Sequence, residues 1–234
     1  RVILIPGVGL FTTGKDYAQA GIPQEIYLHT ISVLKRVSAF TDYTPLDLRH
    51  LGDIEFWPLE TYKYRLLPPE SEFSRRVVLV TGAAGAIGAR TAERFCAAGA
   101  SVVLTDIDFK KAQGLEEAFN RKFGAGRALA VRMDVTSESS VRAGFAQAVL
   151  RYGGLDVLFS NAGIAKSAPV ESLALADWER SFQVNATGHF LCAREALRVF
   201  KTQGIGGAIV FNASKNVLAP GKEFAAYSAA KAAQ

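Results

Sequence analysis

The segment Val77-Val78-Leu79-Val80-Thr81-Gly82-Ala83-Ala84-Gly85-Ala86-Ile87-Gly88 carries the clearest structural signal in the chain. An apolar run leads directly into a glycine-rich turn, and helical sequence follows. Gly82 permits a sharp turn, Gly85 lets the backbone approach a phosphate, and Gly88 lets the helix pack close to the strand. The first N–H groups of that helix would face the anion. The spacing departs from the commoner G-x-G-x-x-G, so a plain packing turn remains the alternative.

Strand-like and helix-like segments alternate from residue 76 onward. The expected strands are apolar without polar alternation, as in strands covered on both faces: Val77–Val80, Val102–Leu104, Ala128–Val131, Val157–Phe159 and Ala208–Phe211. The expected helices are Ile87–Ala98, Phe109–Phe123, Ser139–Tyr152 and Trp178–Phe200. This order predicts an α/β fold with a doubly wound parallel sheet of the Rossmann type, ending after the fifth strand and the start of the next helix. Ligands bind beyond the carboxyl ends of such strands, so the residues there are candidates.

Asp106 closes the second expected strand, 24 residues after Gly82. A carboxylate at this place can accept both ribose hydroxyls of an adenosine and would repel a 2′-phosphate. We therefore expect NAD rather than NADP, although Lys110 and Lys111 are near enough to weaken the preference. The alternative role of Asp106 is an N-cap for the helix that begins at Phe109.

Two further strand ends carry residues suited to a nucleotide. Asp134 and Val135 follow the third strand, where the carboxylate can meet an adenine amino group or cap the helix that enters at Ser137. Asn161-Ala162-Gly163 follows the fourth strand. These small residues let the backbone pass close to a ligand, and a simple turn is the alternative.

Four polar residues lie where chemistry is expected. Tyr227 and Lys231 are four apart, so on a helix they share a face. A nearby ammonium favours the phenolate and brings the pKa of a tyrosine toward the working range of a general acid or base. Ser214 follows the fifth strand and can hold a substrate oxygen. Asn185 lies inside the long helix, where a structural asparagine bonded to a backbone carbonyl is the alternative.

Residues 76–234 resemble the short-chain dehydrogenase/reductase family. They share its T-G-x-x-x-G-x-G turn, its acidic residue at the NAD-selecting position, its Asp-Val pair, its N-A-G turn and its Asn-Ser-Tyr-Lys tetrad in order. The resemblance implies hydride transfer between NAD and a carbon that bears a hydroxyl or carbonyl group. It also implies a set of cofactor-binding residues: Thr81, Gly82, Gly85, Ile87, Gly88, Asp106, Asp134, Val135, Asn161, Ala162, Gly163, Tyr227 and Lys231.

The same resemblance implies a role for each member of the tetrad. Tyr227 would be the acid/base, and Lys231 would lower its pKa and hold the nicotinamide ribose. Ser214 would orient the substrate carbonyl or hydroxyl, and Asn185 would hold a water in the proton relay. The catalytic residues expected from the sequence are therefore Asn185, Ser214, Tyr227 and Lys231.

Three departures from the family are visible. Ser160 stands where the family often has Asn, and Lys215 follows the expected catalytic serine where a small polar residue is usual. The family continues through another strand, a cofactor-contacting loop and a substrate lid, whereas this sequence stops at Gln234. We therefore expect these 234 residues alone to bind cofactor poorly and to turn over little.

The first part of the chain has a different, aromatic and irregular texture. A strand is expected at Val2–Ile5, a turn at Pro6–Gly9, a helix within Lys15–Ser38, and an amphipathic stretch near Leu59–Leu66. The strings VILIPGVGLF and IEFWPLE resemble the stretch before the dehydrogenase in bifunctional rhamnulose-phosphate aldolase/short-chain dehydrogenases. The resemblance implies three parts: the tail of a class II aldolase-like module as a small mixed α/β segment over 1–67, a proline linker over 68–75, and an incomplete dehydrogenase domain over 76–234.

Composition argues against several other classes of protein. The net charge is +5, but no basic run exceeds two residues, so no nucleic-acid partner is expected. No apolar run reaches the roughly 18 residues of a membrane span. Two cysteines cannot build a disulfide framework, which favours a reducing cytoplasm. His29 and His50 have no companions that would complete a zinc shell, and no metal site is expected.

These observations combine into one functional hypothesis. The chain is expected to be the NAD-dependent dehydrogenase part of a protein that also holds a class II aldolase module, with a small substrate such as lactaldehyde. The alternatives are a sugar or sugar-phosphate alcohol dehydrogenase and a non-catalytic nucleotide-binding module. The family resemblance further implies a homo-oligomer.

Overall fold

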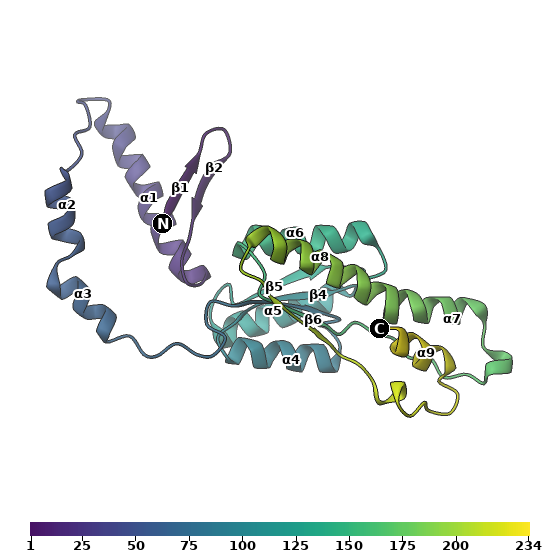
Figure 1. Ribbon diagram of the computed structural model, residues 1–234. Coiled ribbons are helices and arrows are strands. Elements are labelled where there is room, and N and C mark those ends of the chain that lie inside the picture. Colours follow the sequence, from purple (N-terminus) through teal and green to yellow (C-terminus); the bar gives the residue numbers. More distant parts are fainter. The chain divides into compact units, whose positions relative to one another are not determined.

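The computed structural model describes the backbone of all 234 residues and every side chain except that of Glu60. The chain divides into two compact units, Arg1–Ser71 and Glu72–Gln234. Both units are drawn in Figure 1. The division falls inside the predicted linker, 68–75, and Phe73 already packs edge-on against Phe95 of the second unit, with 5.1 Å between ring centroids.

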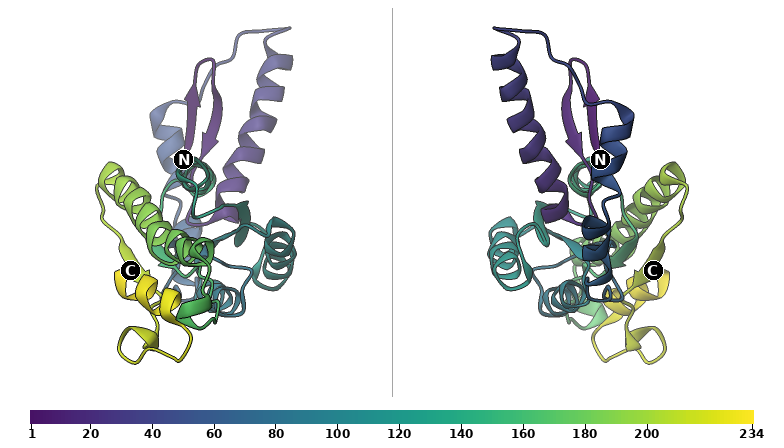
Figure 2. Two further views of the ribbon diagram at one scale, coloured as in Figure 1. Left: turned by 90° about the vertical axis from the view of Figure 1, so that its right-hand side faces the viewer. Right: turned by 90° about the vertical axis from the view of Figure 1, so that its left-hand side faces the viewer.

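The first unit is a hairpin with three helices. Strands β1 (Val2–Ile5) and β2 (Gly9–Thr12) pair antiparallel, and helix α1 (Tyr17–Val37) packs beside them, as both views of Figure 2 show. Helices α2 (Leu48–Glu55) and α3 (Pro58–Arg65) follow.

Strand β2 and helix α2 were not expected from the sequence. The expected turn has positive φ angles at Gly7 (+75°) and Gly9 (+146°), which glycine adopts without strain, and it leads directly into β2. Helix α2 is only eight residues long and has no long apolar period. Its start is marked instead by Asp47, whose side chain accepts the His50 N–H.

The second unit contains a five-stranded parallel sheet, which confirms the predicted fold class. Its strands coincide with the five expected runs: β3 (Val77–Thr81), β4 (Ser101–Asp106), β5 (Ala128–Arg132), β6 (Val157–Ser160) and β7 (Ala208–Phe211). The spatial order is β5-β4-β3-β6-β7, and every neighbouring pair is parallel. Strands β4 and β5 are added on one side of β3, whereas β6 and β7 are added on its other side. The order of addition therefore reverses between β3 and β6, and doubly wound folds form their ligand crevice at such a point.

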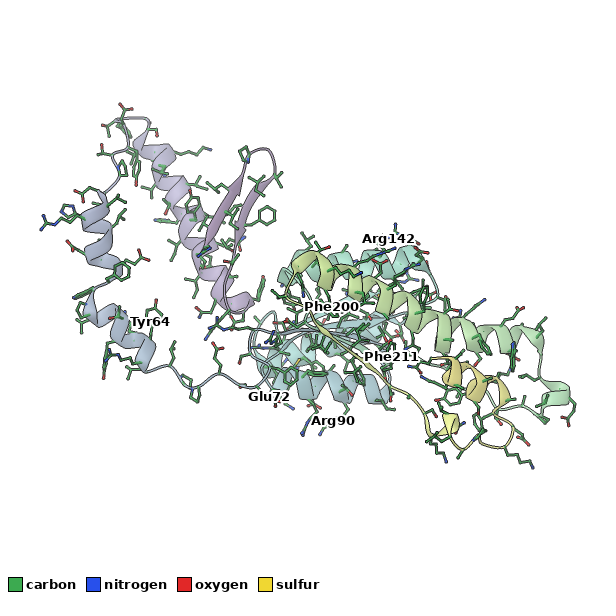
Figure 3. All side chains as sticks on the ribbon, in the orientation of Figure 1. Tyr64, Glu72, Arg90, Arg142, Phe200 and Phe211 are labelled. Atoms are coloured by element: carbon green, nitrogen blue, oxygen red, sulfur yellow. The ribbon has the colours of Figure 1, made fainter. Side chains whose placement is uncertain are left out.

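Helices cover both faces of the sheet. Alternate residues of β3 explain the two layers, since Val78 and Val80 pack with helices α4 (Ala86–Ala97) and α5 (Phe109–Phe123). Leu79 points to the other face, toward helices α6 (Glu138–Tyr152) and α8 (Gly188–Gln203). Figure 3 shows Arg90 of α4 and Arg142 of α6 on opposite sides of the sheet.

The segment Trp178–Phe200, predicted as one helix, is helical throughout, but its α-helical pattern is interrupted by a π turn that the sequence did not predict. The structure has helix α7 (Leu175–Phe182), a π-helical turn over Gln183–Thr187, and then α8. Gly188 allows the close approach at this junction, because a Cβ there would lie 2.9 Å from Cγ2 of Val135. A π turn adds a residue to the helical path, which periodicity over a whole helix does not reveal.

Short elements complete the second unit. The 3₁₀ turn Val170–Ser172 precedes α7, and the 3₁₀ turn Lys215–Val217 and helix α9 (Ala225–Ala233) follow β7. No helix in the described part of the chain combines the length and apolar character that crossing a bilayer requires.

Candidate functional site

The glycine turn after β3 leaves almost no space for side chains. A Cβ on Gly82, whose φ is +62°, would lie 2.8 Å from Cα of Ala162, and one on Gly88 would lie 2.2 Å from the Gly82 carbonyl oxygen. Helix α4 begins after Gly85, which has no side chain to cap it. The N–H groups of its first turn therefore face no capping side chain and are open to an anion.

Asp106 shapes this turn from the end of β4. Its Oδ2 accepts the Ala84 N–H at 2.9 Å, and its Oδ1 accepts the Asp108 N–H at 2.9 Å. The N-cap of α5 is Asp108, which accepts the Lys111 N–H, so the capping alternative for Asp106 is wrong. Asp106 is free to present its remaining lone pairs to a ligand.

Asp134 is likewise not a helix cap. Its Oδ1 accepts both the N–H and the hydroxyl of Thr136, at 2.9 and 2.7 Å, while Ser137 caps α6. Partial burial opposes ionisation, but the two hydrogen bonds from Thr136 hold the pKa of the Asp134 carboxyl below its usual value.

Thr81 joins the ends of β3 and β6. Its Oγ1 accepts the backbone N–H groups of Asn161 and Ala162 at 2.8 and 2.9 Å, and the Asn161 side chain donates to its carbonyl at 2.9 Å. The side chain of Thr81 is buried. Thr81 and Asn161 therefore hold the N-A-G turn against the glycine turn.

A pocket of about 320 Å³ opens between these strand ends. Seven of the predicted cofactor-binding residues line it: Gly82, Gly85, Asp106, Asp134, Val135, Ala162 and Gly163. The predicted cofactor-binding set did not include the other lining residues, of which only Lys111 was considered, as a cation near the ribose: Ala84, Ile107, Asp108, Lys111, Met133, Ile164, Arg180 and Val184. Five of these, Ala84, Ile107, Met133, Ile164 and Val184, directly follow or precede a residue of the predicted cofactor-binding set or of the tetrad. Arg180 lies on α7, and no motif marks it. Six predicted cofactor-binding residues do not line the pocket: Thr81, Ile87, Gly88, Asn161, Tyr227 and Lys231.

Helix α9 carries Tyr227 and Lys231 one turn apart, as predicted. The Lys231 amine donates to the Asn212 carbonyl at 2.9 Å and to Gln234 Oε1 at 2.7 Å. Lys231 is only 5% exposed, and burial lowers the pKa of its amine. A Cβ on Gly163 would lie 3.9 Å from Lys231 Nζ, which places the amine against the wall of the pocket.

The side chain of Asn185 makes three hydrogen bonds that shape the site. Its Oδ1 accepts the Ile164 N–H at 3.0 Å, and its Nδ2 donates to the Ile164 carbonyl at 2.8 Å and to Ser181 Oγ at 3.1 Å. Asn185 is completely buried in the π turn. Its amide therefore fixes the loop after β6, as the structural alternative proposed.

Tyr227 lies on α9 and Ser214 starts a turn that packs against this helix, but the two side chains are not hydrogen-bonded to each other in the described structure. Ser214 Oγ accepts the Asn216 N–H at 3.2 Å and starts the 3₁₀ turn that packs on α9. The ring of Tyr227 lies edge-on to Phe224, with 6.2 Å between centroids. The tetrad residues are thus placed around α9 and the π turn, with only Lys231 and Asn185 brought together at Gly163.

His189 is a buried residue behind this site, only 3% exposed. Its Nδ1 lies 2.6 Å from Ser160 Oγ at the end of β6. Burial, reinforced by the charge of Lys231, lowers the pKa of His189 to about 4, against a smaller opposing effect of the Ala162 carbonyl. The imidazole is therefore neutral near pH 7.

This burial predicts an acid-sensitive fold. Between pH 6.5 and 4 the unfolded chain binds a proton at His189 that the folded chain does not. The contribution of His189 is therefore complete above pH 6.5, and the free energy of unfolding should fall by about 3 kcal/mol as the pH drops to 4. Denaturant unfolding of the His189→Phe variant should show a flatter pH dependence across this window. The matched change at exposed His29, His29→Phe, should leave the slope as it is.

The described residues contain no group of three or more His, Cys, Asp or Glu side chains arranged to hold a metal ion. His50 instead pairs with Asp47, with Nδ1 2.8 Å from Oδ1.

The parallel sheet, its order and the glycine-rich strand-to-helix turn define a Rossmann-type nucleotide-binding fold. A family model for short chain dehydrogenase matches residues 76–234. The chain belongs to the short-chain dehydrogenase family. A second model, the second domain of class II aldolases, matches residues 1–64, so the dehydrogenase segment is associated with a class II aldolase module.

Curated relatives agree with this assignment. The chain is 44% identical over 232 residues to the uncharacterized oxidoreductase YuxG of Bacillus subtilis, covering 99% of this chain and 34% of that protein. It is 45% identical over 163 residues to cis-4-hydroxycyclohexanecarboxylate dehydrogenase of Sinomonas cyclohexanicum, covering 68% of this chain and 63% of the relative. It is 37% identical over 156 residues to sorbitol-6-phosphate 2-dehydrogenase of Escherichia coli, covering 67% and 60%. The chain thus spans about a third to two thirds of these relatives.

Solved structures show the same fold. Sorbitol-6-phosphate 2-dehydrogenase of Erwinia amylovora matches with a TM-score of 0.64 and 36% identity, covering 67% of this chain and 61% of that one. The 3-ketoacyl-(acyl-carrier-protein) reductase of Brucella melitensis, solved with NADH, matches with a TM-score of 0.62 and 32% identity, covering 67% and 64%.

Proposed function

We propose that this chain is the dehydrogenase part of an NAD-dependent enzyme that interconverts a small hydroxy compound, such as lactaldehyde, and its oxidised form, next to a class II aldolase module. The observation that carries the proposal is the pocket at the β3/β6 reversal. The glycine turn, Asp106 and the N-A-G turn all line it, and Lys231 lies against its wall.

The residues present fit a dinucleotide. Glycines at 82 and 88 stand where any Cβ would strike backbone, and the first turn of α4 faces no capping side chain. These features suit a pyrophosphate. Asp106 lines the pocket at the place that a ribose diol would require. Lys111 and Arg180 are cations that line the pocket, and Lys111 is already paired with Asp108 at 2.9 Å, which supports NAD over NADP.

The chemistry that bound NAD supplies is hydride transfer. On this proposal, Tyr227 takes the proton from a substrate hydroxyl, or returns it to a carbonyl oxygen, and Ser214 holds that same oxygen. Lys231 stabilises the charge that develops on the tyrosine oxygen and holds the nicotinamide ribose. The Asn185 amide bonds both the N–H and the carbonyl of Ile164, so on this proposal Asn185 positions the loop after β6, and the second lone pair of its Oδ1 is the acceptor left for a water of the proton relay.

The similarity to sorbitol-6-phosphate 2-dehydrogenases favours a second candidate, a sugar or sugar-phosphate alcohol dehydrogenase. The intact protein should be assayed for NADH formation at 340 nm with lactaldehyde, with sorbitol 6-phosphate and with unphosphorylated polyols. Turnover with lactaldehyde supports the first candidate, and preference for the phosphorylated polyol supports the second. Binding of NADH without turnover on the whole set would instead favour the non-catalytic nucleotide-binding module.

Removing the Asp106 carboxylate should change cofactor choice. Asp106→Ala loses two acceptors for the ribose hydroxyls and the repulsion of a 2′-phosphate, so the ratio of NADH to NADPH affinity should fall by about tenfold or more. Fluorescence titration with both nucleotides measures this ratio. The control is Asp177→Ala, which removes an acidic residue of α7 that pairs with Lys166 and should leave the ratio unchanged. An unchanged ratio for Asp106→Ala would contradict the ribose role.

The proposed enzyme is a cytoplasmic homo-oligomer. Exposed apolar side chains on α8, Phe190 at 58% and Leu197 at 50% exposure, support contacts between copies. Sedimentation of the intact protein measures the association, and a monomer at micromolar concentration would contradict it.

A further inference from the structure

A continuous chain of hydrogen bonds runs from Lys231 into the interior. The Lys231 amine donates to Gln234 Oε1 at 2.7 Å, and Gln234 Nε2 lies 3.2 Å from Nδ1 of His189. The same Nδ1 lies 2.6 Å from Ser160 Oγ, at the end of strand β6. The four residues come from α9, its end, α8 and β6, so the chain crosses from one layer to the sheet.

The directions of these bonds follow from what each group can do. An ammonium only donates, so the atom of Gln234 that faces Lys231 is its oxygen. The atom that faces His189 is then the amide nitrogen, which also only donates. Nδ1 of His189 must therefore be an acceptor, and the proton of the neutral ring lies on Nε2. That Nε2 is buried and meets no well-aligned hydrogen-bond partner in the described part of the chain, although the Ala162 carbonyl is near enough to raise the imidazole pKa. The contacts at Nδ1 therefore set the tautomer.

We propose that His189 is a positioning residue, which holds the Lys231 amine in place through Gln234 and does so only as a neutral imidazole. A protonated ring would turn an N–H toward the amide nitrogen of Gln234 and break the chain. Its role in catalysis rests on the function proposed above for Lys231.

Charge and burial favour the neutral ring. His189 and Lys231 are both at least 95% buried, and Lys231 is the charged group that acts on the imidazole among the described residues. Two buried positive charges connected by one amide would repel each other. Ser160, whose Oγ lies 2.6 Å from Nδ1, directly precedes the N-A-G turn at the pocket and so connects the imidazole to that turn.

The test is an NMR titration of the Lys231 side chain in the intact protein without cofactor. The signal of its ε-carbon is assigned by its loss in Lys231→Met. Gln234→Met removes an acceptor that favours the ammonium, so the Lys231 pKa should fall by about one pH unit, a tenfold change in its protonation equilibrium. His189→Phe should shift the pKa in the same direction. His189→Asn offers an amide oxygen near the position of Nδ1 and should restore the value.

The two changes should not add. Because His189 acts through Gln234, the double variant should have the Lys231 pKa of Gln234→Met alone. A residue needed only for packing would lower the unfolding midpoint and leave that pKa unmoved. Gln234 is half-buried at the end of α9, so its variant tests the chain even where His189→Phe does not fold.

Two results would overturn the inference. One is a Lys231 pKa that His189→Phe leaves unchanged in a folded protein. The other is a ¹⁵N spectrum at pH 7 that shows the His189 proton on Nδ1 or on both nitrogens. Neither measurement uses substrate or cofactor, so its failure is distinct from a failure of dehydrogenase activity. Where turnover is present, the acidic limb of the kcat profile should move in His189→Phe and return in His189→Asn.

Discussion

The Tyr227→Phe variant should keep its affinity for NADH and lose about a thousandfold in kcat. The phenol is the only part of the side chain that can exchange a proton with substrate, and phenylalanine preserves the ring that packs against Phe224. Loss of the proton acceptor removes an interaction made in the transition state, so kcat should fall with little change in cofactor binding. Steady-state kinetics of the intact protein, together with fluorescence titration of NADH, would measure both quantities.

Tyr152 provides the matched control. Tyr152 is the last residue of α6, and its hydroxyl donates to the Gly126 carbonyl at 2.9 Å. Burial raises the pKa of this hydroxyl well above the usual value. Tyr152→Phe removes one structural hydrogen bond, which should cost about 1 kcal/mol of stability and leave kcat unchanged. If Tyr227→Phe behaved like Tyr152→Phe, with lower stability and normal turnover, Tyr227 would not be the acid/base.

The Gly88→Ala variant should lose both stability and cofactor binding. A Cβ at this position would lie 2.2 Å from the Gly82 carbonyl oxygen and 2.9 Å from Cα of Ala83, and backbone cannot yield as a flexible side chain can. Helix α4 must then move away from β3, which should cost about 3 kcal/mol. The displaced helix N-terminus should also weaken NADH binding by at least about tenfold. Denaturant unfolding and NADH titration measure these two effects.

Gly114 is the corresponding control in α5. No atom lies within 4 Å of a Cβ built there, and the position is exposed and helical. Gly114→Ala should therefore raise the free energy of unfolding by about 0.5–1 kcal/mol and leave NADH affinity unchanged. Equal behaviour of the two alanine variants would show that Gly88 is not needed for close packing of the turn.

The strands of the sheet were predictable because each is a short apolar run, and β3 through β7 fall on the expected residues. The same local signals located Gly82, Asp106 and the N-A-G turn beside the pocket. Elements without such signals were missed. The π turn at Asn185 disturbs the helical period by one residue. The eight-residue helix α2 has only one local signal, the N-cap at Asp47.

The roles of individual side chains were less predictable than their positions. Asp106 and Asp134 were each possible N-caps of the helix that follows. The structure shows that Asp108 caps α5 and Ser137 caps α6 instead. Thr81 carries a family motif but bonds the Asn161 turn and does not line the pocket. Each of these outcomes depends on which backbone N–H lies within reach, and neighbouring candidates differ by only one to three residues in sequence.

Periodicity, glycine spacing and strand-end residues were enough for the amino-acid sequence to determine a parallel sheet with a nucleotide-type turn, because these preferences are local to each segment. The tertiary structure alone decided which distant side chains meet. It brought Asn185 onto the backbone of Ile164, and it joined Lys231 to His189 through Gln234. Those contacts arise because α8 packs against β6 and α9 packs against the π turn, and no residue pattern within one segment specifies them.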